Sequence, residues 1–263
     1  MTLPSFIILG AAKAGTTALY RYMEQHPQIG MSRVKETNYF ALAGESLDFR
    51  GPGDRDYIGR FTVTTEDDYA EQFRGCEGSD AIGEASPLYL YSEKVPRRLA
   101  DAVPDAKLIA ILRNPVDRAF SAFLHLVRDR RETTRDFGEA LRLEDSRVAD
   151  RWEHIWHYRR MGLYHEQLMR YLEHFDRDQI RVHIYRDFRT GPAEVLADLF
   201  RFVGVSDGFV PDMSIRHNIS SPSTDQRPHL AGEVRAELQD FFREDILALQ
   251  DLLGRDLSHW LHR

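Results

Sequence analysis

Several features that would place a protein in a special class are rare or absent in this sequence. It has one cysteine, Cys76, so no internal disulfide can form, and a reducing, cytoplasmic location is expected. No apolar run approaches the roughly 20 residues that cross a bilayer, and the N-terminus has no basic signal-peptide start. The formal net charge of −7 disfavours nucleic-acid binding. We therefore expect a globular protein with neither a membrane nor a nucleic-acid partner.

Short apolar runs alternate with helical patterns along the chain. The runs that predict buried strands are 6–9, 81–84, 107–112 and 180–185. Helices are predicted at 17–25, 65–73, 94–103, 115–130, 136–160, 163–175, 192–203 and 231–253. This alternation indicates an α/β fold, with a central parallel sheet in a three-layer αβα arrangement. Because no linker stands out, residues 1–263 are expected to form one domain, with long loops at 44–60 and 206–229.

A loop of small residues follows the first predicted strand and opens the first helix. It reads Gly-Ala-Ala-Lys-Ala-Gly-Thr-Thr over residues 10–17. Small residues let the backbone turn several N–H groups toward one anion, and the helix N-terminus and Lys13 add positive charge. The alternative is a plain strand-to-helix turn with an exposed lysine. The pattern predicts a P-loop-like phosphate site.

The spacing of that loop is not that of a Walker A motif. A Walker A loop places lysine directly after its second glycine, but here Thr16 follows Gly15 and the lysine comes two residues earlier. This misfit disfavours the main competing function, a small-molecule kinase. Asp187, after the strand at 180–185, is a poor candidate for the magnesium ligand that a kinase needs.

A second candidate phosphate site follows the strand at 107–112. Arg113 lies at the carboxyl end of that strand, where ligands bind in open parallel sheets, and a guanidinium can hold a phosphate with two hydrogen bonds. Pro115 suits the first turn of a helix, which places Ser121 one to two turns later. The helix is expected to bury Phe120, Phe123, Leu124 and Val127. The alternative is a surface Arg–Asp pair with an incidental serine. Two phosphate sites predict a ligand with two separated phosphates.

The eleven histidines suggest no metal centre. His154 and His157 lie at helical spacing, but Trp152 and Trp156 beside them indicate an ordinary amphipathic helix. We therefore expect no metal ion.

The two phosphate segments together resemble the sulfotransferases that use 3′-phosphoadenosine 5′-phosphosulfate (PAPS). Further segments are similar to the branch with heparan sulfate sulfotransferases and many bacterial domains: 35–40 (KETNYF), 83–87 (GEASP) and 160–164 (RMGLY). Their order along the chain also fits. The resemblance implies transfer of a sulfuryl group from PAPS to an acceptor hydroxyl, leaving adenosine 3′,5′-bisphosphate (PAP), without a metal.

The same resemblance implies roles for individual residues. Lys13 would stabilise the leaving phosphate, and Glu36 stands at the position of the family's catalytic base. The 5′ side of PAPS would be held by Lys13, Ala14, Gly15, Thr16 and Thr17, and the 3′-phosphate by Arg113 and Ser121. Heparan-type enzymes also have a cysteine pair and a basic loop late in the chain. This chain lacks the pair and offers only a loose counterpart to the loop, namely Arg216, His217, Asn218 and Arg227.

The acceptor side is less defined. Lys35, Glu84, Ser86 and His125 are candidates to contact the acceptor, although Glu84 and Ser86 can equally serve to cap a turn. His125 is the rival to Glu36 as base. The segment 29–31 is expected beside the first strand, which would bring Glu36 toward the Lys13 loop. A sugar, a lipid-like alcohol or a secondary metabolite would fit as acceptor, and a catalytically silent nucleotide-binding module is a third possible function.

Overall fold

The computed structural model describes residues 2–214 and 228–262. The chain divides into two compact units. Among the described residues, the first unit contains 2–46, 61–112 and 170–214, and the second contains 47–60, 113–169 and 228–262. The expectation of a single domain over 1–263 stays a prediction.

The first unit contains a parallel sheet of five strands in the order β2-β3-β1-β4-β5. The strands are β1 (Phe6–Gly10), β2 (Ile29–Met31), β3 (Ala81–Ala85), β4 (Lys107–Leu112) and β5 (Ile180–Ile184). Every residue of β1 is buried, as is all of β4 after Lys107. A parallel sheet covered on both faces requires such continuous apolar runs, and this is why the sequence revealed these strands.

The position of β2 differs from the expectation. Ile29–Met31 pairs with β3, so β3 separates it from β1. Sequence can predict that a short apolar run becomes a strand, but the neighbour of that strand depends on packing between distant segments.

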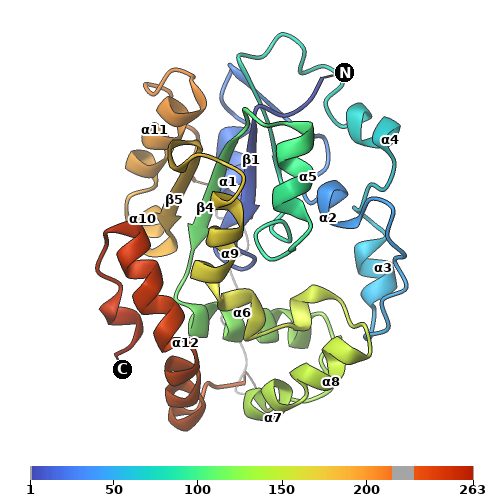
Figure 1. The fold of residues 1–263 in the computed structure, drawn as a ribbon, viewed down its shortest axis with the longest axis vertical. Coiled ribbons are helices and arrows are strands. Elements are labelled where there is room, and N and C mark those ends of the chain that lie inside the picture. Colours follow the sequence, from blue (N-terminus) through green and yellow to red (C-terminus); the bar gives the residue numbers. More distant parts are fainter. Residues whose placement is uncertain (1, 215–227, 263) are drawn as a thin grey trace. The chain divides into compact units, whose positions relative to one another are not determined.

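Helices cover the two faces of this sheet. Those of the first unit are α1 (Thr16–Met23), α2 (Tyr39–Leu42), α4 (Glu66–Glu71), α5 (Val95–Ala102), α10 (Tyr185–Thr190), α11 (Pro192–Val203) and η3 (Arg177–Gln179). Figure 1 shows α5 in front of the strands and α1, drawn fainter, behind them. Ring contacts join α1 and the turn after it to α10 and α11, through Tyr22–Phe188 and His26–Phe200. The predicted three-layer αβα architecture is confirmed.

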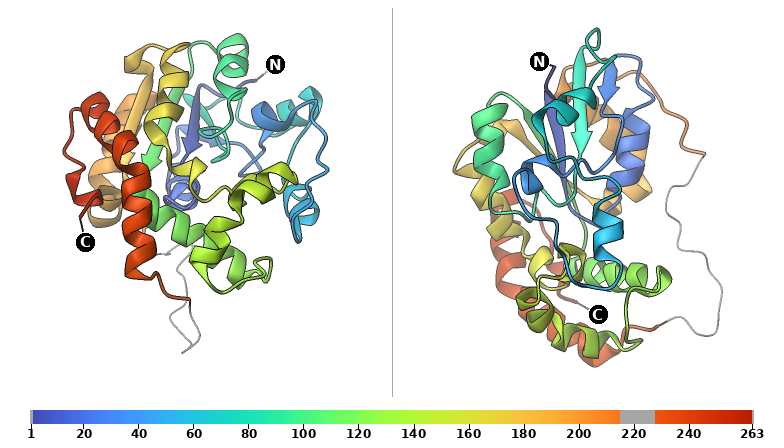
Figure 2. Two further views of the ribbon diagram at one scale, coloured as in Figure 1. Left: turned by 60° about the horizontal axis from the view of Figure 1, so that its bottom comes forward. Right: turned by 90° about the vertical axis from the view of Figure 1, so that its right-hand side faces the viewer.

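The second unit is helical. Its elements are α3 (Asp54–Ile58), α6 (Pro115–Arg128), α7 (Phe137–Arg142), α8 (Glu144–Ala149), η1 (His154–Trp156), η2 (Arg160–Gly162), α12 (Gly232–Leu253) and η4 (Ser258–Trp260). The helix α9 (Tyr164–Leu172) runs across the division between the units. The 22-residue α12, red in Figure 2, packs against α6. No helix among the described residues is both long enough and apolar enough to cross a membrane.

Several helix signals in the sequence were correct. Thr65 caps α4, with its hydroxyl accepting from the Asp68 N–H at 3.2 Å. Pro115 and Pro192 begin α6 and α11, where a missing N–H costs nothing.

Two other expectations in the second unit were wrong. The predicted helix 136–160 is α7, α8 and the short η1, because Arg151 has a φ of 59° and Glu153 donates its N–H to the Asp54 carboxylate at 2.7 Å. The predicted loop 44–60 contains α3, which begins at that same Asp54. The Asp54 carboxylate is fully buried and also accepts from Gly51 N–H and Trp156 Nε1 at 2.8 Å each.

Candidate functional site

The predicted phosphate loop joins β1 to α1 in the first unit. Its backbone is anchored by the Ala11 N–H, which donates to Ile111 O at 2.8 Å. Lys13 and Gly15 have φ values of 68° and 95°, so the chain makes a left-handed turn before α1 begins at Thr16. No described side chain caps this helix start. Its first N–H groups have no intrahelical acceptor, so the corner has the geometry of an anion site.

Tyr185 is a residue of this corner that the sequence reasoning missed. A Cβ placed on Gly15 would lie 3.0 Å from the Tyr185 ring and 3.6 Å from Phe188. A side chain at Gly15 would therefore crowd the Tyr185 ring, in addition to the strain of its positive φ. The available signal was that Tyr185 directly follows a parallel strand, the position where such folds place ligand-binding residues.

The proposed base lies on the segment after β2. Glu36 donates its N–H to Ala85 O at 2.8 Å, and its φ of 70° is unusual for a residue other than glycine. Its side chain is 32% exposed, which leaves the carboxylate accessible. Lys35 forms an ion pair with that carboxylate. The structure thus brings these two candidates together on one segment of the first unit.

Glu84 and Ser86 lie inside the protein at the end of β3, and both are fully buried. The Glu84 carboxylate accepts hydrogen bonds from Thr37 Oγ1 at 2.6 Å and from the Tyr69 hydroxyl at 2.8 Å. Ser86 Oγ accepts from the Asn38 N–H at 3.1 Å. Burial raises the pKa of Glu84, and these hydroxyl donors oppose that shift. Both candidates are therefore bound to the segment that carries Glu36.

The second candidate phosphate motif lies at the start of the segment 113–169 of the second unit. Arg113 follows β4 directly, and its carbonyl oxygen accepts from the Tyr164 hydroxyl at 2.9 Å. Asn114 caps α6, its Oδ1 accepting from the N–H groups of Val116 at 3.0 Å and Asp117 at 3.4 Å. The helix start is therefore already occupied by a side chain, and an anion there would depend on side-chain donors.

Ser121 and His125 lie on α6, one turn apart and both half-buried. His125 Nδ1 lies 2.7 Å from Arg128 Nη2, and its Nε2 lies 3.5 Å from the Asp129 carboxylate. Asp117, predicted on the same face, pairs with Arg235 of α12 at 2.9 Å. His125 thus already has a cationic and an anionic neighbour in the second unit.

The buried face of α6 differs from the expected one. Of the four residues predicted to form it, Phe123 is fully buried while Phe120, Leu124 and Val127 are partly exposed. The residues that are buried include three small or β-branched ones, Val116, Ala119 and Ala122. Short side chains let neighbouring elements approach closely, so alanine can occupy a core position that a count of large apolar residues overlooks.

Arg118 is the second residue that sequence reasoning missed. It is fully buried, and its Nη2 donates to Tyr158 O. Its Nε and Nη1 have no hydrogen-bond partner in the described part of the chain. Burial lowers the pKa of Arg118, and the neighbouring Arg113 lowers it further, whereas Tyr164 and Glu144 raise it. No local pattern distinguishes a buried arginine from the exposed ones of an amphipathic helix.

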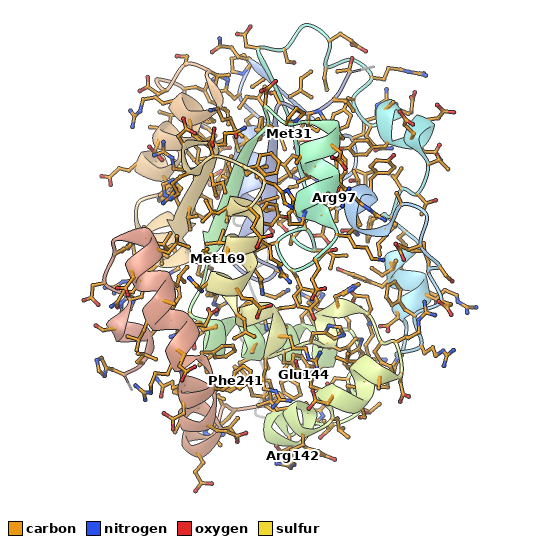
Figure 3. All side chains as sticks on the ribbon, in the orientation of Figure 1. Met31, Arg97, Arg142, Glu144, Met169 and Phe241 are labelled. Carbon is orange, nitrogen blue, oxygen red and sulfur yellow. The ribbon has the colours of Figure 1, made fainter. Side chains whose placement is uncertain are left out.

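The matched segment 160–164 packs on the start of α6. A Cβ on Gly162 would lie 2.9 Å from Pro115 Cβ and 2.7 Å from the Phe242 ring, so only glycine fits. Glu144, labelled in Figure 3, accepts from the backbone N–H groups of Arg159 and Arg160 at 2.9 and 3.2 Å. Together with the Tyr164–Arg113 bond, these contacts fix the Arg113–Pro115 corner within its unit.

Two remaining expectations from the sequence concern the late basic loop and the histidine pair. Arg227 lies outside the described residues, as do Arg216, His217 and Asn218. His157 is buried, which lowers its pKa to about 3, and its ring centroid lies 5.4 Å from that of His154. The neutral His157 therefore packs within the second unit.

Comparison with known proteins places this chain in a family. A model described as "Sulfotransferase family" matches residues 4–208. A membrane-associated sulfotransferase of Dictyostelium discoideum is 24% identical over 98% of this chain and 67% of its own length. A bifunctional heparan sulfate N-deacetylase/N-sulfotransferase of Xenopus laevis is 26% identical over 98% of this chain. The chain spans only 31% of that second relative.

Solved structures give the same result. A sulfotransferase from Alicyclobacillus acidocaldarius is 42% identical, with a TM-score of 0.90 over 99% of both chains. A mouse sulfotransferase in complex with PAP is 13% identical, with a TM-score of 0.53 over 95% of this chain and 88% of its own, and so shares the fold. The P-loop-like α/β fold, the loop motifs and the family match agree. This chain belongs to the sulfotransferase family, enzymes whose activity is PAPS-dependent sulfuryl transfer.

Proposed function

We propose that this chain transfers the sulfuryl group of PAPS to a hydroxyl of a small-molecule or glycan acceptor, with Glu36 as general base. The observation that carries the proposal is the corner between β1 and α1. There a left-handed turn at Lys13 and Gly15 leads into a helix that no described side chain caps. Such a corner suits the 5′-phosphosulfate, and Lys13 adds a full positive charge.

The proposed reaction is an in-line displacement at sulfur. The acceptor oxygen forms a bond to sulfur while the bond from sulfur to the bridging oxygen of the 5′-phosphate breaks. The acceptor proton passes to the Glu36 carboxylate, and the electron pair of the broken bond stays on the phosphate of PAP. Lys13 stabilises the charge that develops there. The partial exposure of Glu36 and its ion pair with Lys35 support this role, since the carboxylate is accessible and lies beside a cation.

The cofactor is proposed to be held by two sets of residues. Ala14, Gly15, Thr16 and Thr17 bind the 5′ side through backbone N–H groups and hydroxyls. Arg113 and Ser121 bind the 3′-phosphate through side chains, with Arg227 as a further contact. The capped start of α6 supports the second assignment, because Asn114 already occupies the helix N–H groups.

The acceptor is proposed to be a sugar, a lipid-like alcohol or a secondary metabolite, and the site of action the bacterial cytoplasm. The single cysteine, which is buried, supports a reducing compartment. An acceptor panel should include amino sugars beside alcohols, because several relatives are named N-sulfotransferases. Transfer of labelled sulfate to amines alone would correct the acceptor class and leave the donor assignment intact.

Ligand-induced stabilisation tests the donor assignment. PAP should raise the melting temperature in the presence of EDTA, because a ligand selective for the folded state stabilises that state. ATP serves as the comparison, with and without magnesium. Stabilisation by ATP and magnesium but not by PAP would instead support the kinase alternative.

A pair of substitutions tests the base. Glu36→Gln should keep PAP affinity and lower the transfer rate by about 10²-fold or more, because the amide cannot take the acceptor proton. His125→Ala should cost much less, since Arg128 and Asp129 already engage the His125 ring. An active Glu36→Gln enzyme beside an inactive His125→Ala enzyme, both binding PAP, would reverse the assignment.

A further inference from the structure

The first unit buries one carboxylate whose described partners are all hydroxyls. Glu84 is fully buried, and its Oε2 accepts from Thr37 at 2.6 Å and from Ser86 at 3.3 Å. Its Oε1 accepts from the Tyr69 hydroxyl at 2.8 Å. No ion pair of Glu84 with a basic side chain occurs among residues 2–214 and 228–262. Burying an acid without a cation is costly, so these hydroxyl donors are needed to hold the carboxylate in the core.

Among these hydroxyl donors, Thr37 matters most for catalysis, because it directly follows Glu36, the proposed base. Thr37 lies between Glu36, with a φ of 70°, and Asn38, with a φ of 52°. A left-handed conformation is unfavourable for a residue such as Glu36 and persists only where the surroundings impose it. The backbone is fixed at Glu36, whose N–H donates to Ala85 O, and at Asn38, whose N–H donates to Ser86 Oγ. The Thr37–Glu84 bond fixes the side chain between those two points.

We propose that Glu84 is a positioning residue: by holding Thr37 it sets the backbone turn that aims the Glu36 carboxylate at the acceptor. This inference rests on the proposed function, in which Glu36 is the base. Glu84 itself contacts no reacting atom, because it is fully buried. A base displaced by about 1 Å can lose about 10²-fold in rate, so a bond that fixes its backbone affects catalysis without touching substrate.

Tyr69 supplies a matched control for Thr37. Both residues donate one hydroxyl to the same buried carboxylate, at 2.8 and 2.6 Å, and both are buried. Tyr69 lies on α4, away in sequence from Glu36, and its ring stacks on Tyr39 with centroids 4.3 Å apart. Tyr69→Phe therefore removes a hydroxyl and keeps the ring contact. Loss of either donor should destabilise the fold to a similar extent, whereas of these two donors only Thr37 directly adjoins the base in the chain.

The experiment compares Thr37→Val, Thr37→Ser and Tyr69→Phe for kcat, for PAP affinity and for melting temperature. Thr37→Val should lower kcat by about 10- to 10²-fold with PAP affinity unchanged, and Thr37→Ser should restore most of the rate. Tyr69→Phe should change kcat by less than about 3-fold, with a melting temperature as low as that of Thr37→Val. Glu84→Gln, measured beside them, should lower kcat by about 10-fold or more with PAP affinity kept.

A double substitution separates this inference from the proposed function. Thr37→Val should have almost no further effect on rate when Glu36 is already glutamine, because two residues that act as one unit are not additive. Equal losses of kcat in Thr37→Val and Tyr69→Phe, or a full Thr37→Val effect in the Glu36→Gln background, would overturn the positioning role while Glu36 stays the base. An active Glu36→Gln enzyme would instead overturn the base assignment, and the positioning role with it, but would leave PAP binding intact.

Discussion

Two corners of this protein lead from a parallel strand into a helix, and they differ in how the helix begins. The corner from β1 to α1 contains small residues and positive φ angles at Lys13 and Gly15, and no described side chain caps α1. The corner from β4 to α6 is capped by Asn114 and has Pro115 at its first helical position. An uncapped helix start binds an anion through its backbone, whereas a capped one leaves that task to side chains. The two corners therefore predict different sensitivities to substitution.

The largest effect among substitutions at these corners is expected for Arg113→Ala. If the second corner binds through side chains, loss of this guanidinium should weaken PAP by about 1.5–3 kcal/mol, or roughly 10- to 10²-fold. AMP and adenosine 5′-phosphosulfate, which lack the 3′-phosphate, should bind almost as before. Isothermal titration calorimetry measures the three affinities. Equal weakening of all three ligands would show that Arg113 does not recognise the 3′-phosphate.

Arg142→Ala provides a charge-matched control for that experiment. Arg142 is exposed on α7, where Figure 3 labels it, and its removal changes the net charge by the same amount. Its removal should leave PAP affinity within about twofold of the original, because exposed charges are largely screened by solvent and salt.

An intermediate effect is expected for Gly15→Ala. Gly15 has a φ of 95°, and a methyl group there would lie 3.0 Å from the Tyr185 ring. The substitution should lower the free energy of unfolding by about 1–2 kcal/mol through backbone strain and crowding. If this corner binds the 5′-phosphate through its backbone, PAP and AMP should be weakened alike, in contrast to Arg113→Ala. Urea unfolding and calorimetry measure the two quantities, and unchanged affinity for AMP would contradict a backbone anion site.

The smallest effect is expected for Asn114→Ala. Loss of a side-chain cap should lower the free energy of unfolding by about 1 kcal/mol, within the usual range of 0.5–2 kcal/mol. Asn114→Asp keeps an acceptor for the N–H groups of Val116 and Asp117 and should be nearly neutral. PAP affinity should change little in either variant. A strong loss of PAP affinity in Asn114→Ala, without a loss of stability, would mean that Asn114 binds the ligand and does not cap the helix.

Much of this molecule was determined by local sequence alone. The apolar runs of β1 and β4 are buried on both faces, and Pro115, Pro192 and Thr65 begin helices where the sequence predicted them. The small residues at 10–17 also define the first corner. These features depend on backbone sterics, on missing or capped N–H groups and on uninterrupted runs of apolar residues. Each of these can be read from residues that are close in sequence.

Other features were decided only by the tertiary structure. The strand 29–31 pairs with β3 and not with β1, Tyr185 lies against Gly15, and Glu84 is a buried acid linked to Thr37. Arg118 is a charged residue on a helix, yet it is fully buried. Each of these depends on partners brought together from distant parts of the chain, and the free energy of burying a polar or charged group depends on those partners as well as on its own type. Sequence therefore suggested the candidate site residues, whereas packing decided which residues surround them.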